Sequence, residues 1–162
     1  MSRTFLSWLS GPESAGPDRP DTYPGQALGL PGTGPGSLAG MGRRLLALAL
    51  DYFIAVGLVA LAVPLGWTTW EAIQYSLDLR FAISAIWILL GVVAVRLFGF
   101  TPGQYACGLQ VIPVDSADTG VGIVRAVGRM LLIALVVPPL FTDADGRGLQ
   151  DRATATAVVR SR

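Results

Sequence analysis

Residues 43–65 of the chain read RRLLALALDYFIAVGLVALAVPL, and this stretch decides the class of fold. From Leu45 to Leu65 the only charged residue is Asp51. A helix of this length covers about 30 Å, the thickness of the hydrocarbon core of a bilayer. A carboxylate placed there costs about 2.5–3.5 kcal/mol on insertion scales, so it usually has a partner or a function. The stretch therefore predicts a membrane helix that contains a buried acid.

The composition of the whole chain agrees with a membrane protein. Of its 162 residues, 52% are hydrophobic and 14% are charged, and the mean hydropathy is +0.55, which is high for a soluble domain. The net charge of +1 gives no basic footprint for nucleic acid. His is absent and Cys107 is the single cysteine, so the sequence has neither a histidine base nor a cysteine-rich metal site. We therefore expect no catalytic residues, no metal, no cofactor and no enzymatic activity.

Residues 1–40 differ in composition from the rest of the chain. They contain eight Gly and six Pro, and no apolar segment of the kind found in secretory signals follows Arg3. Such a segment buries too little apolar surface to offset the entropy of the chain. We predict that residues 1–40 form a disordered leader.

A second apolar segment runs from Phe81 to Phe98. Arg80 precedes it and Arg96 lies near its end, with fifteen uncharged residues between the two arginines. The long side chain of Arg96 can reach the membrane interface from there. We predict a second transmembrane helix over this segment.

The third apolar segment, residues 121–141, allows two interpretations. Arg125 and Arg129 lie in its first half, four residues apart and therefore on one face of a helix. Pro138 and Pro139 interrupt helical hydrogen bonding in its second half. The segment is either a kinked full crossing or a re-entrant helix that dips into the membrane and returns. The predicted fold is an all-α membrane protein with spans at about 45–65 and 81–98, this third segment, and a polar tail over residues 142–162.

The arginines predict an orientation and also a conflict. Arg43 and Arg44 precede the first span, whereas residues 66–79 contain no basic residue. Because cytoplasmic loops are enriched in basic residues, we expect a cytoplasmic N-terminus. A full third crossing would place the tail outside, yet the tail contains four arginines, which favours the cytoplasm.

Two polar segments have the pattern of strands. Residues 109–114 form one, and Pro113 would confine it to the edge of a sheet. Residues 154–159 form the other, with Thr at alternate positions before two Val. If they pair as a small cytoplasmic β pair, both lie on one side of the membrane, which favours the re-entrant alternative. Residues 100–103, Phe-Thr-Pro-Gly, predict a type II turn.

Four of these segments together resemble the RDD family, named for one arginine and two aspartates. The run Gly42–Asp51 resembles its first helix, with Arg44 seven residues before Asp51. Thr101-Pro102-Gly103-Gln104 and then Gly108-Leu109-Gln110-Val111 resemble the family pattern TPGK…GLRV. Gly148-Leu149-Gln150-Asp151 and Thr156-Ala157-Val158-Val159 resemble GLHD…GTVVV, which makes Asp151 the second aspartate.

The resemblance covers about residues 40–160, and this chain departs from the pattern at three positions. Gln104, Gln110 and Gln150 stand where the family usually has Lys, Arg and His. The resemblance implies a small protein of the bacterial cytoplasmic membrane, a family for which transport has been suggested. Roles that need those charges or an imidazole do not carry over to this chain.

The buried acid needs a partner. Arg44 and Asp51 share a helix face but lie about 10 Å apart along its axis, too far for direct contact. Arg125 and Arg129 are the remaining candidates, because their segment also enters the membrane. Our hypothesis is a buried Asp51–Arg129 pair within a network of Arg44, Asp51, Arg125 and Arg129. For Asp151 we expect a turn or capping role.

Three classes of function remain open from the sequence, and the third, an enzyme, is the least favoured because the Ser and Cys residues lack a His base. The first is an accessory or scaffold subunit that interacts with other membrane proteins in a larger complex. The second is a homo-oligomeric transporter or ion exchanger in which Asp51 titrates. In the first two cases the expected partners are the lipid bilayer and other protein chains.

Overall fold

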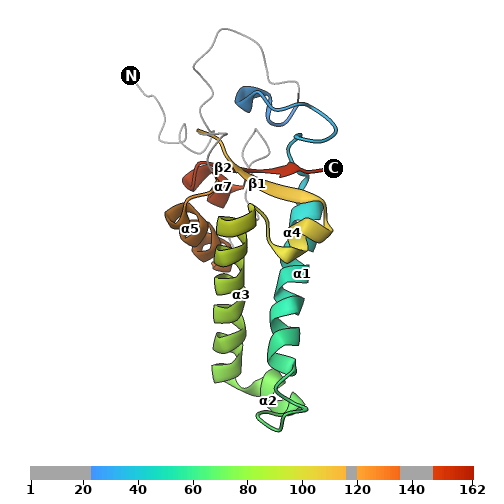
Figure 1. Ribbon diagram of the computed structural model, residues 1–162, viewed down its shortest axis with the longest axis vertical. Coiled ribbons are helices and arrows are strands. Elements are labelled where there is room, and N and C mark those ends of the chain that lie inside the picture. Colours follow the sequence, from blue (N-terminus) through green and yellow to red (C-terminus); the bar gives the residue numbers. More distant parts are fainter. Residues whose placement is uncertain (1–22, 116–119, 136–147) are drawn as a thin grey trace, which may run out of the picture.

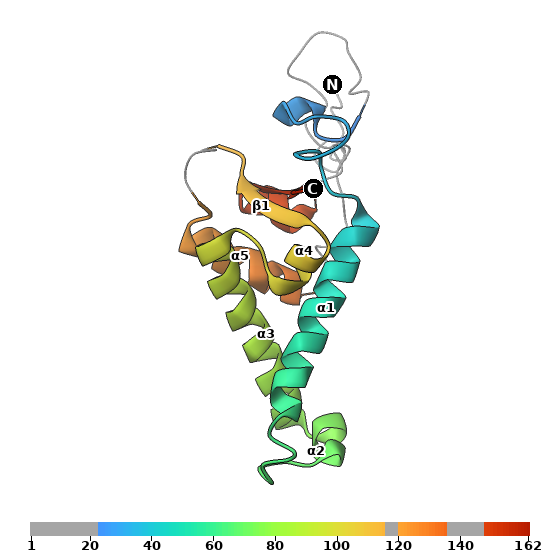
Figure 2. The ribbon, with the colours of Figure 1, turned by 45° about the vertical axis from the view of Figure 1, so that its right-hand side comes forward.

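The computed structural model describes residues 23–115, 120–135 and 148–162. Two long helices, α1 (Met41–Ala60) and α3 (Leu77–Phe98), are joined by a turn and the short helix α2 (Trp70–Tyr75). In Figures 1 and 2 these helices run antiparallel, meet at the α2 end and diverge toward the opposite end. We call α1, α2 and α3 the stem. The other described elements gather at the open end of the stem and form the head.

The stem has a small interior and a large apolar surface. The core cluster near its α2 end consists of Ala55, Val59, Ile73 and Ile83. Many large apolar side chains point outward instead, and Phe53 and Phe81 are 69% and 74% exposed. This distribution is the reverse of a soluble helical hairpin and suits helices that are surrounded by lipid or by other apolar helices.

Only one described helix has both the length and the composition to cross a membrane. This is α3, with 22 residues and a mean hydropathy of 2.3. It starts before the predicted Phe81, because the Ser76 side chain accepts a hydrogen bond from the Leu79 N–H and caps the helix there. The predicted membrane span in α1 is not confirmed, since this helix ends at Ala60 and includes three charged residues.

The head begins with a short helix where the sequence predicted a turn. Residues Pro102–Ala106 form α4. The Thr101 hydroxyl accepts from the Gln104 N–H, and the Gln104 side chain accepts from the Thr101 N–H, which is a capping box. Pro102 occupies the first helical position, where its missing N–H costs nothing. The predicted type II turn is therefore wrong.

The predicted β pair is confirmed. β1 (Leu109–Pro113) pairs antiparallel with β2 (Thr156–Arg160), with Leu109 opposite Arg160. β2 starts two residues later than predicted, because Ala155 has a φ of +48°, in the left-handed region that ends an extended strand.

The prediction of a disordered leader does not hold for its second half. Residues 37–39 run along the free edge of β2: the Ala39 N–H donates to Val158 and the Arg160 N–H donates to Ser37. Ala39 is 3% exposed and belongs to the main core of the head. Pairing with β2 therefore orders the segment before α1. Residues 1–22 lie outside the described part of the chain.

The third apolar segment forms a short helix that packs against α3. This helix, α5 (Ile123–Ala134), has 12 residues and a length of about 18 Å, too little to cross a membrane. Its Met130 side chain fills the space left by Gly91 on α3. Pro138 and Pro139 lie outside the described residues.

The next described helix, α7 (Leu149–Ala153), lies in the head, and β2 follows it and pairs with β1. The tail therefore lies at the same end of the stem as the start of α1 (Figure 1). This arrangement favours the re-entrant alternative over a full third crossing. The core that joins these head elements consists of Ala39, Ala47, Val95, Leu109, Val111, Val121, Ala126 and Val158.

Candidate functional site

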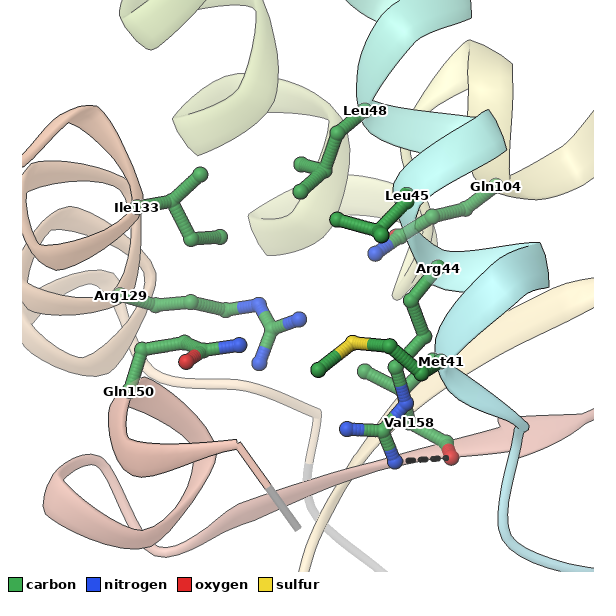
Figure 3. A pocket seen from close by; sticks show the side chains of 9 residues that line it. All are labelled: Met41, Arg44, Leu45, Leu48, Gln104, Arg129, Ile133, Gln150 and Val158. Carbon is green, nitrogen blue, oxygen red and sulfur yellow. Dashed lines mark hydrogen bonds between the residues drawn. The ribbon is translucent and has the colours of Figure 1, made fainter. Parts of the chain in front are cut away.

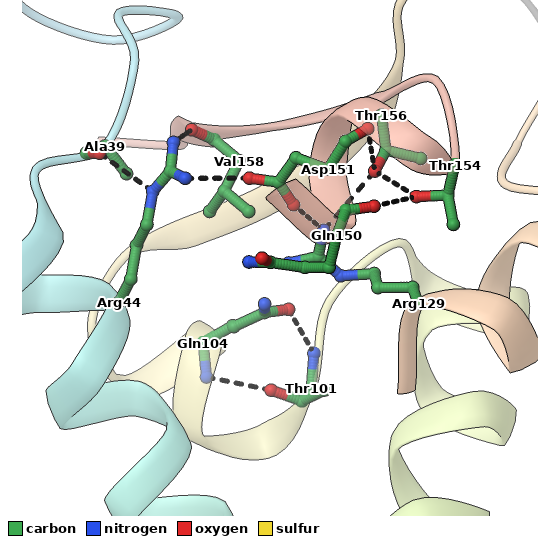
Figure 4. Close-up of polar contacts among 10 residues, drawn as sticks. All are labelled: Ala39, Arg44, Thr101, Gln104, Arg129, Gln150, Asp151, Thr154, Thr156 and Val158. Atoms are coloured by element: carbon green, nitrogen blue, oxygen red, sulfur yellow. Dashed lines mark hydrogen bonds and ion pairs between the residues drawn. The ribbon is translucent and has the colours of Figure 1, made fainter. Parts of the chain in front are cut away.

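A buried carboxylate lies at the centre of the head. Asp151, in the first turn of α7, is 0% exposed. Its Oδ2 accepts a hydrogen bond from Arg44 Nη1 at 2.7 Å, and its Oδ1 accepts one from Arg129 Nη1. Figure 4 shows the two arginines reaching this carboxylate from α1 and α5. We call Arg44, Arg129 and Asp151 the charged cluster.

Arg44 connects four segments of the chain. Besides its bond to Asp151, its Nε donates to the Ala39 carbonyl at 2.9 Å and its Nη2 to the Val158 carbonyl at 3.3 Å (Figure 4). The planar guanidinium presents these donors in fixed directions, a geometry that Lys cannot reproduce. Arg44 therefore holds the start of α1 against α7, β2 and the segment before α1.

Arg129 is also buried, with 3% of its surface exposed. Its Nη1 also donates to the Thr156 hydroxyl at 3.3 Å, which adds a contact to the beginning of β2. Burial, and secondarily the positive charge of Arg44, lowers the pKa of Arg129 to about 9. The side chain is still a cation at neutral pH, and Asp151 neutralises part of the buried positive charge.

Among the described residues, Asp51 contacts the N-terminal end of α4 and no arginine. Its Oδ2 accepts from the Thr101 hydroxyl at 2.5 Å and its Oδ1 from the Gly103 N–H at 2.7 Å. The predicted Asp51–Arg129 pair is therefore wrong: Arg129 binds Asp151, which enters the head with α7. The carboxylate of Asp51 is instead satisfied by the N-terminal turn of α4, where N–H groups favour a negative charge.

Gly103 makes this contact possible. A Cβ atom at this position would lie 2.2 Å from the Ala47 carbonyl oxygen and 2.9 Å from the Asp51 carboxylate carbon. Any side chain would push α4 away from α1 and break the hydrogen bond to Asp51. Gly103 is thus required by the close approach of two backbones.

Arg125 does not belong to the buried network. Its side chain is 33% exposed and pairs with Asp115 through N–O distances of 2.6 and 2.5 Å. These hydrogen bonds raise the pKa of Arg125. Arg129 lies one turn further along α5. At that position the side chain is buried and reaches Asp151, whereas Arg125 remains at the surface.

A cavity of about 20 Å³ lies beside the charged cluster (Figure 3). It is enclosed by α1, α4, α5, α7 and β2, and its volume suffices for about one water-sized group. The residues that line it are Met41, Arg44, Leu45, Leu48, Gln104, Arg129, Ile133, Gln150 and Val158.

The structure brings together most of the motif residues named from the sequence. Arg44 and Asp151 meet directly, and Asp51 meets Thr101 and Gly103. Pro102 starts α4, and Gly108 has a φ of +64° at the bend into β1. Sequence reasoning missed that Gln104 and Gln150 line one cavity, because their separation in sequence gives no sign of their proximity.

The chemistry of this arrangement is that of a buried ionic and hydrogen-bonded core. Within residues 23–115, 120–135 and 148–162, no group of three Cys, Asp or Glu side chains is placed to hold a metal ion. The carboxylates of Asp51 and Asp151 each accept strong hydrogen bonds on both oxygens. Each of them fixes the position of one head element against α1.

Comparison with known proteins gives one family. The model of the RDD family matches residues 38–154, which include every element from α1 to α7. The searches of curated proteins and of solved structures found no significant match. The matched residues contain the arginine and the two aspartates of the family motif, all in the contacts described above. The chain therefore belongs to the RDD family, whose members are membrane-associated.

Proposed function

We propose that this protein is an accessory or scaffold subunit of the bacterial cytoplasmic membrane that binds other membrane proteins through its stem. One observation carries the proposal: the buried charges of the head are engaged with one another, while the stem presents its apolar side chains outward. The exposed set on α1 and α3 includes Leu46, Phe53, Leu58, Phe81, Leu89 and Val93.

The contacts of Asp51 support this function over transport. A carrier acid must exchange a proton or an ion with water. Asp51 is 2% exposed, and its two carboxylate oxygens accept hydrogen bonds from the Thr101 hydroxyl and the Gly103 N–H. The part of α3 from Phe81 to Val95 contains no ionisable residue that could continue a proton path.

The distribution of charge supports an orientation with the head in the cytoplasm. Arg43 and Arg96 flank the stem at the head end, and Arg152 and Arg160 lie in the head. The α2 end has Arg80 together with Glu71 and Asp78. By the positive-inside bias, the head and the residues before α1 are cytoplasmic.

Site-specific photo-crosslinking tests the proposal. A benzoylphenylalanine replaces Phe53 on the stem or, as the control, Tyr105 in the head; these side chains are 69% and 60% exposed. We expect the Phe53 probe to crosslink one defined membrane protein after mild solubilisation, with no such product from Tyr105. Crosslinks from Phe53 only to lipid or to a second copy, together with ion flux in proteoliposomes that Asp51→Asn abolishes, would contradict it.

A further inference from the structure

The cavity beside the charged cluster has an unusual polar wall. Its side-chain polar groups are two guanidinium groups, from Arg44 and Arg129, and two carboxamides, from Gln104 and Gln150. Figure 3 shows nitrogen atoms of Gln104, Gln150 and Arg129 turned toward the space between them. Each of these three residues is at most 5% exposed, so little of any of these side chains is open to bulk water.

The orientation of the Gln104 amide is fixed by its contacts. Its Oε1 accepts a hydrogen bond of 3.0 Å from the Thr101 N–H in the capping box. The opposite end of the amide, Nε2, is therefore the end presented to the cavity. It donates to no group in the described part of the chain.

Arg129 also has donors to spare. Its hydrogen bonds to Asp151 and Thr156 both start from Nη1. Nε and Nη2 have no acceptor among the residues that the structure describes, and only 3% of the residue is exposed. A guanidinium can donate five N–H bonds, so an acceptor in the cavity would complete its coordination.

Gln150 makes no side-chain hydrogen bond to the described chain. Its Oε1 is buried without a partner, and its Nε2 faces the guanidinium of Arg129 in Figure 3. A buried amide without partners is costly, and natural structures contain few. Gln150 is thus a polar residue of the cavity wall, beside Arg129, and is 4% exposed.

We propose that the cavity binds one oxygen of a phosphate group, which accepts hydrogen bonds from Arg129, Gln104 and Gln150. Donors that converge without an acceptor select an anion, and guanidinium groups pair especially well with phosphate. The carboxylate of Asp151 does not compete, because both its oxygens are already bonded to arginine.

The source of the phosphate is either a phospholipid or free phosphate. The cavity volume of about 20 Å³ admits a single oxygen, so the rest of the phosphate group remains at its mouth. Leu45, Leu48 and Ile133 are among the apolar residues of the wall and would contact the glycerol or acyl region of a lipid (Figure 3).

Thermal unfolding of the full-length protein in phosphate-free detergent tests the proposal, followed by tryptophan fluorescence. One arm adds inorganic phosphate against sodium chloride of equal ionic strength. The other adds phosphatidylglycerol against diacylglycerol, which lacks the phosphate. We expect Tm to rise by at least about 3 °C in one phosphate arm. A response to inorganic phosphate identifies the free ion as sufficient, and a response to the lipid alone identifies a headgroup.

Two variants separate the cavity from other phosphate-binding surfaces. Gln150→Met keeps the size of the side chain and removes the amide, so its Tm should not respond to phosphate. Gln110→Met makes the same exchange on β1, outside the cavity, and should respond as the wild type does. If Gln150→Met does not fold, Gln150→Asn, which withdraws the amide by one methylene, gives the same readout. A wild-type Tm that is unchanged in both arms, or an unchanged response in the Gln150 variant, would overturn the proposal.

Discussion

The two aspartates of the motif have different partners, and these partners decide what each residue does. Asp151 accepts from two guanidinium groups and is a centre of buried charge. Asp51 accepts from a hydroxyl and a backbone N–H and acts as an anchor for α4. The sequence identified both residues and placed Asp51 in a helix, but it predicted the wrong cation for Asp51. That choice depends on the path of residues 148–151, which no local pattern reveals.

Neutralising the two aspartates should therefore have unequal effects. Asp151→Asn leaves Arg44 and Arg129 buried without a counter-charge, and we expect a loss of about 3–5 kcal/mol in the free energy of unfolding. Asp51→Asn keeps one acceptor oxygen and should cost about 1–2 kcal/mol. Unfolding of both variants in mixed detergent micelles measures the difference. A larger loss for Asp51→Asn would show that Asp51 holds the buried charge.

Arg44 and its neighbour Arg43 provide a matched pair for the role of the guanidinium. Arg44→Lys keeps the charge but loses the separate bonds to the Ala39 and Val158 carbonyls, so we expect a loss of about 2 kcal/mol. Arg43 is exposed, and Arg43→Lys should change stability by less than about 0.5 kcal/mol. Equal melting temperatures for the two variants would contradict the account of Arg44.

At the scale of elements, regular patterns were predictable and close contacts were not. Alternation of side chains identified β1 and β2, and their pairing followed from the need to bury one face of each. The type II turn failed because the Thr-Pro-Gly-Gln sequence also satisfies a capping box, and Gln104 decides between the two. The end of α1 at Ala60 was missed because the apolar run continues through the following turn.

Packing of α4 on α1 gives a prediction at this scale. Gly103→Ala places a Cβ atom 2.2 Å from the Ala47 carbonyl oxygen, a backbone atom that cannot move aside. We expect a loss of at least about 2 kcal/mol or failure to fold. Gly42→Ala, in α1 with nothing within 4 Å of the added Cβ, is the control and should be neutral or slightly stabilising. Similar stability of the two variants would show that α4 does not contact α1 closely.

At the scale of the whole molecule, the charges of the tail agree with its place in the fold better than the number of apolar segments does. β2 lies between β1 and residues 37–39, so the tail and the segment before α1 share one end of the stem. Of the two alternatives for the third segment, the short helix α5 packed on α3 favours the re-entrant one. Residues 136–147 lie outside the described part, and the sequence left two alternatives open for this segment.

Cysteine labelling in intact cells tests this arrangement, with Cys107→Ser as the background. Gln74→Cys lies on α2, and Ser161→Cys follows β2. We expect a membrane-impermeant thiol reagent to label position 74 in intact cells and position 161 only after lysis. Labelling of position 161 in intact cells would place the tail outside and contradict the proposed orientation.

Asp151, and not Asp51, binds the guanidinium of Arg129 and thereby joins α5 to α7. Two double-mutant cycles in mixed detergent micelles test it directly, one between Arg129→Met and Asp151→Leu and one between Arg129→Met and Asp51→Leu. We predict a coupling energy of about 2 kcal/mol or more in the first cycle and less than about 0.5 kcal/mol in the second. A coupling that is absent in the first cycle and large in the second would contradict the claim.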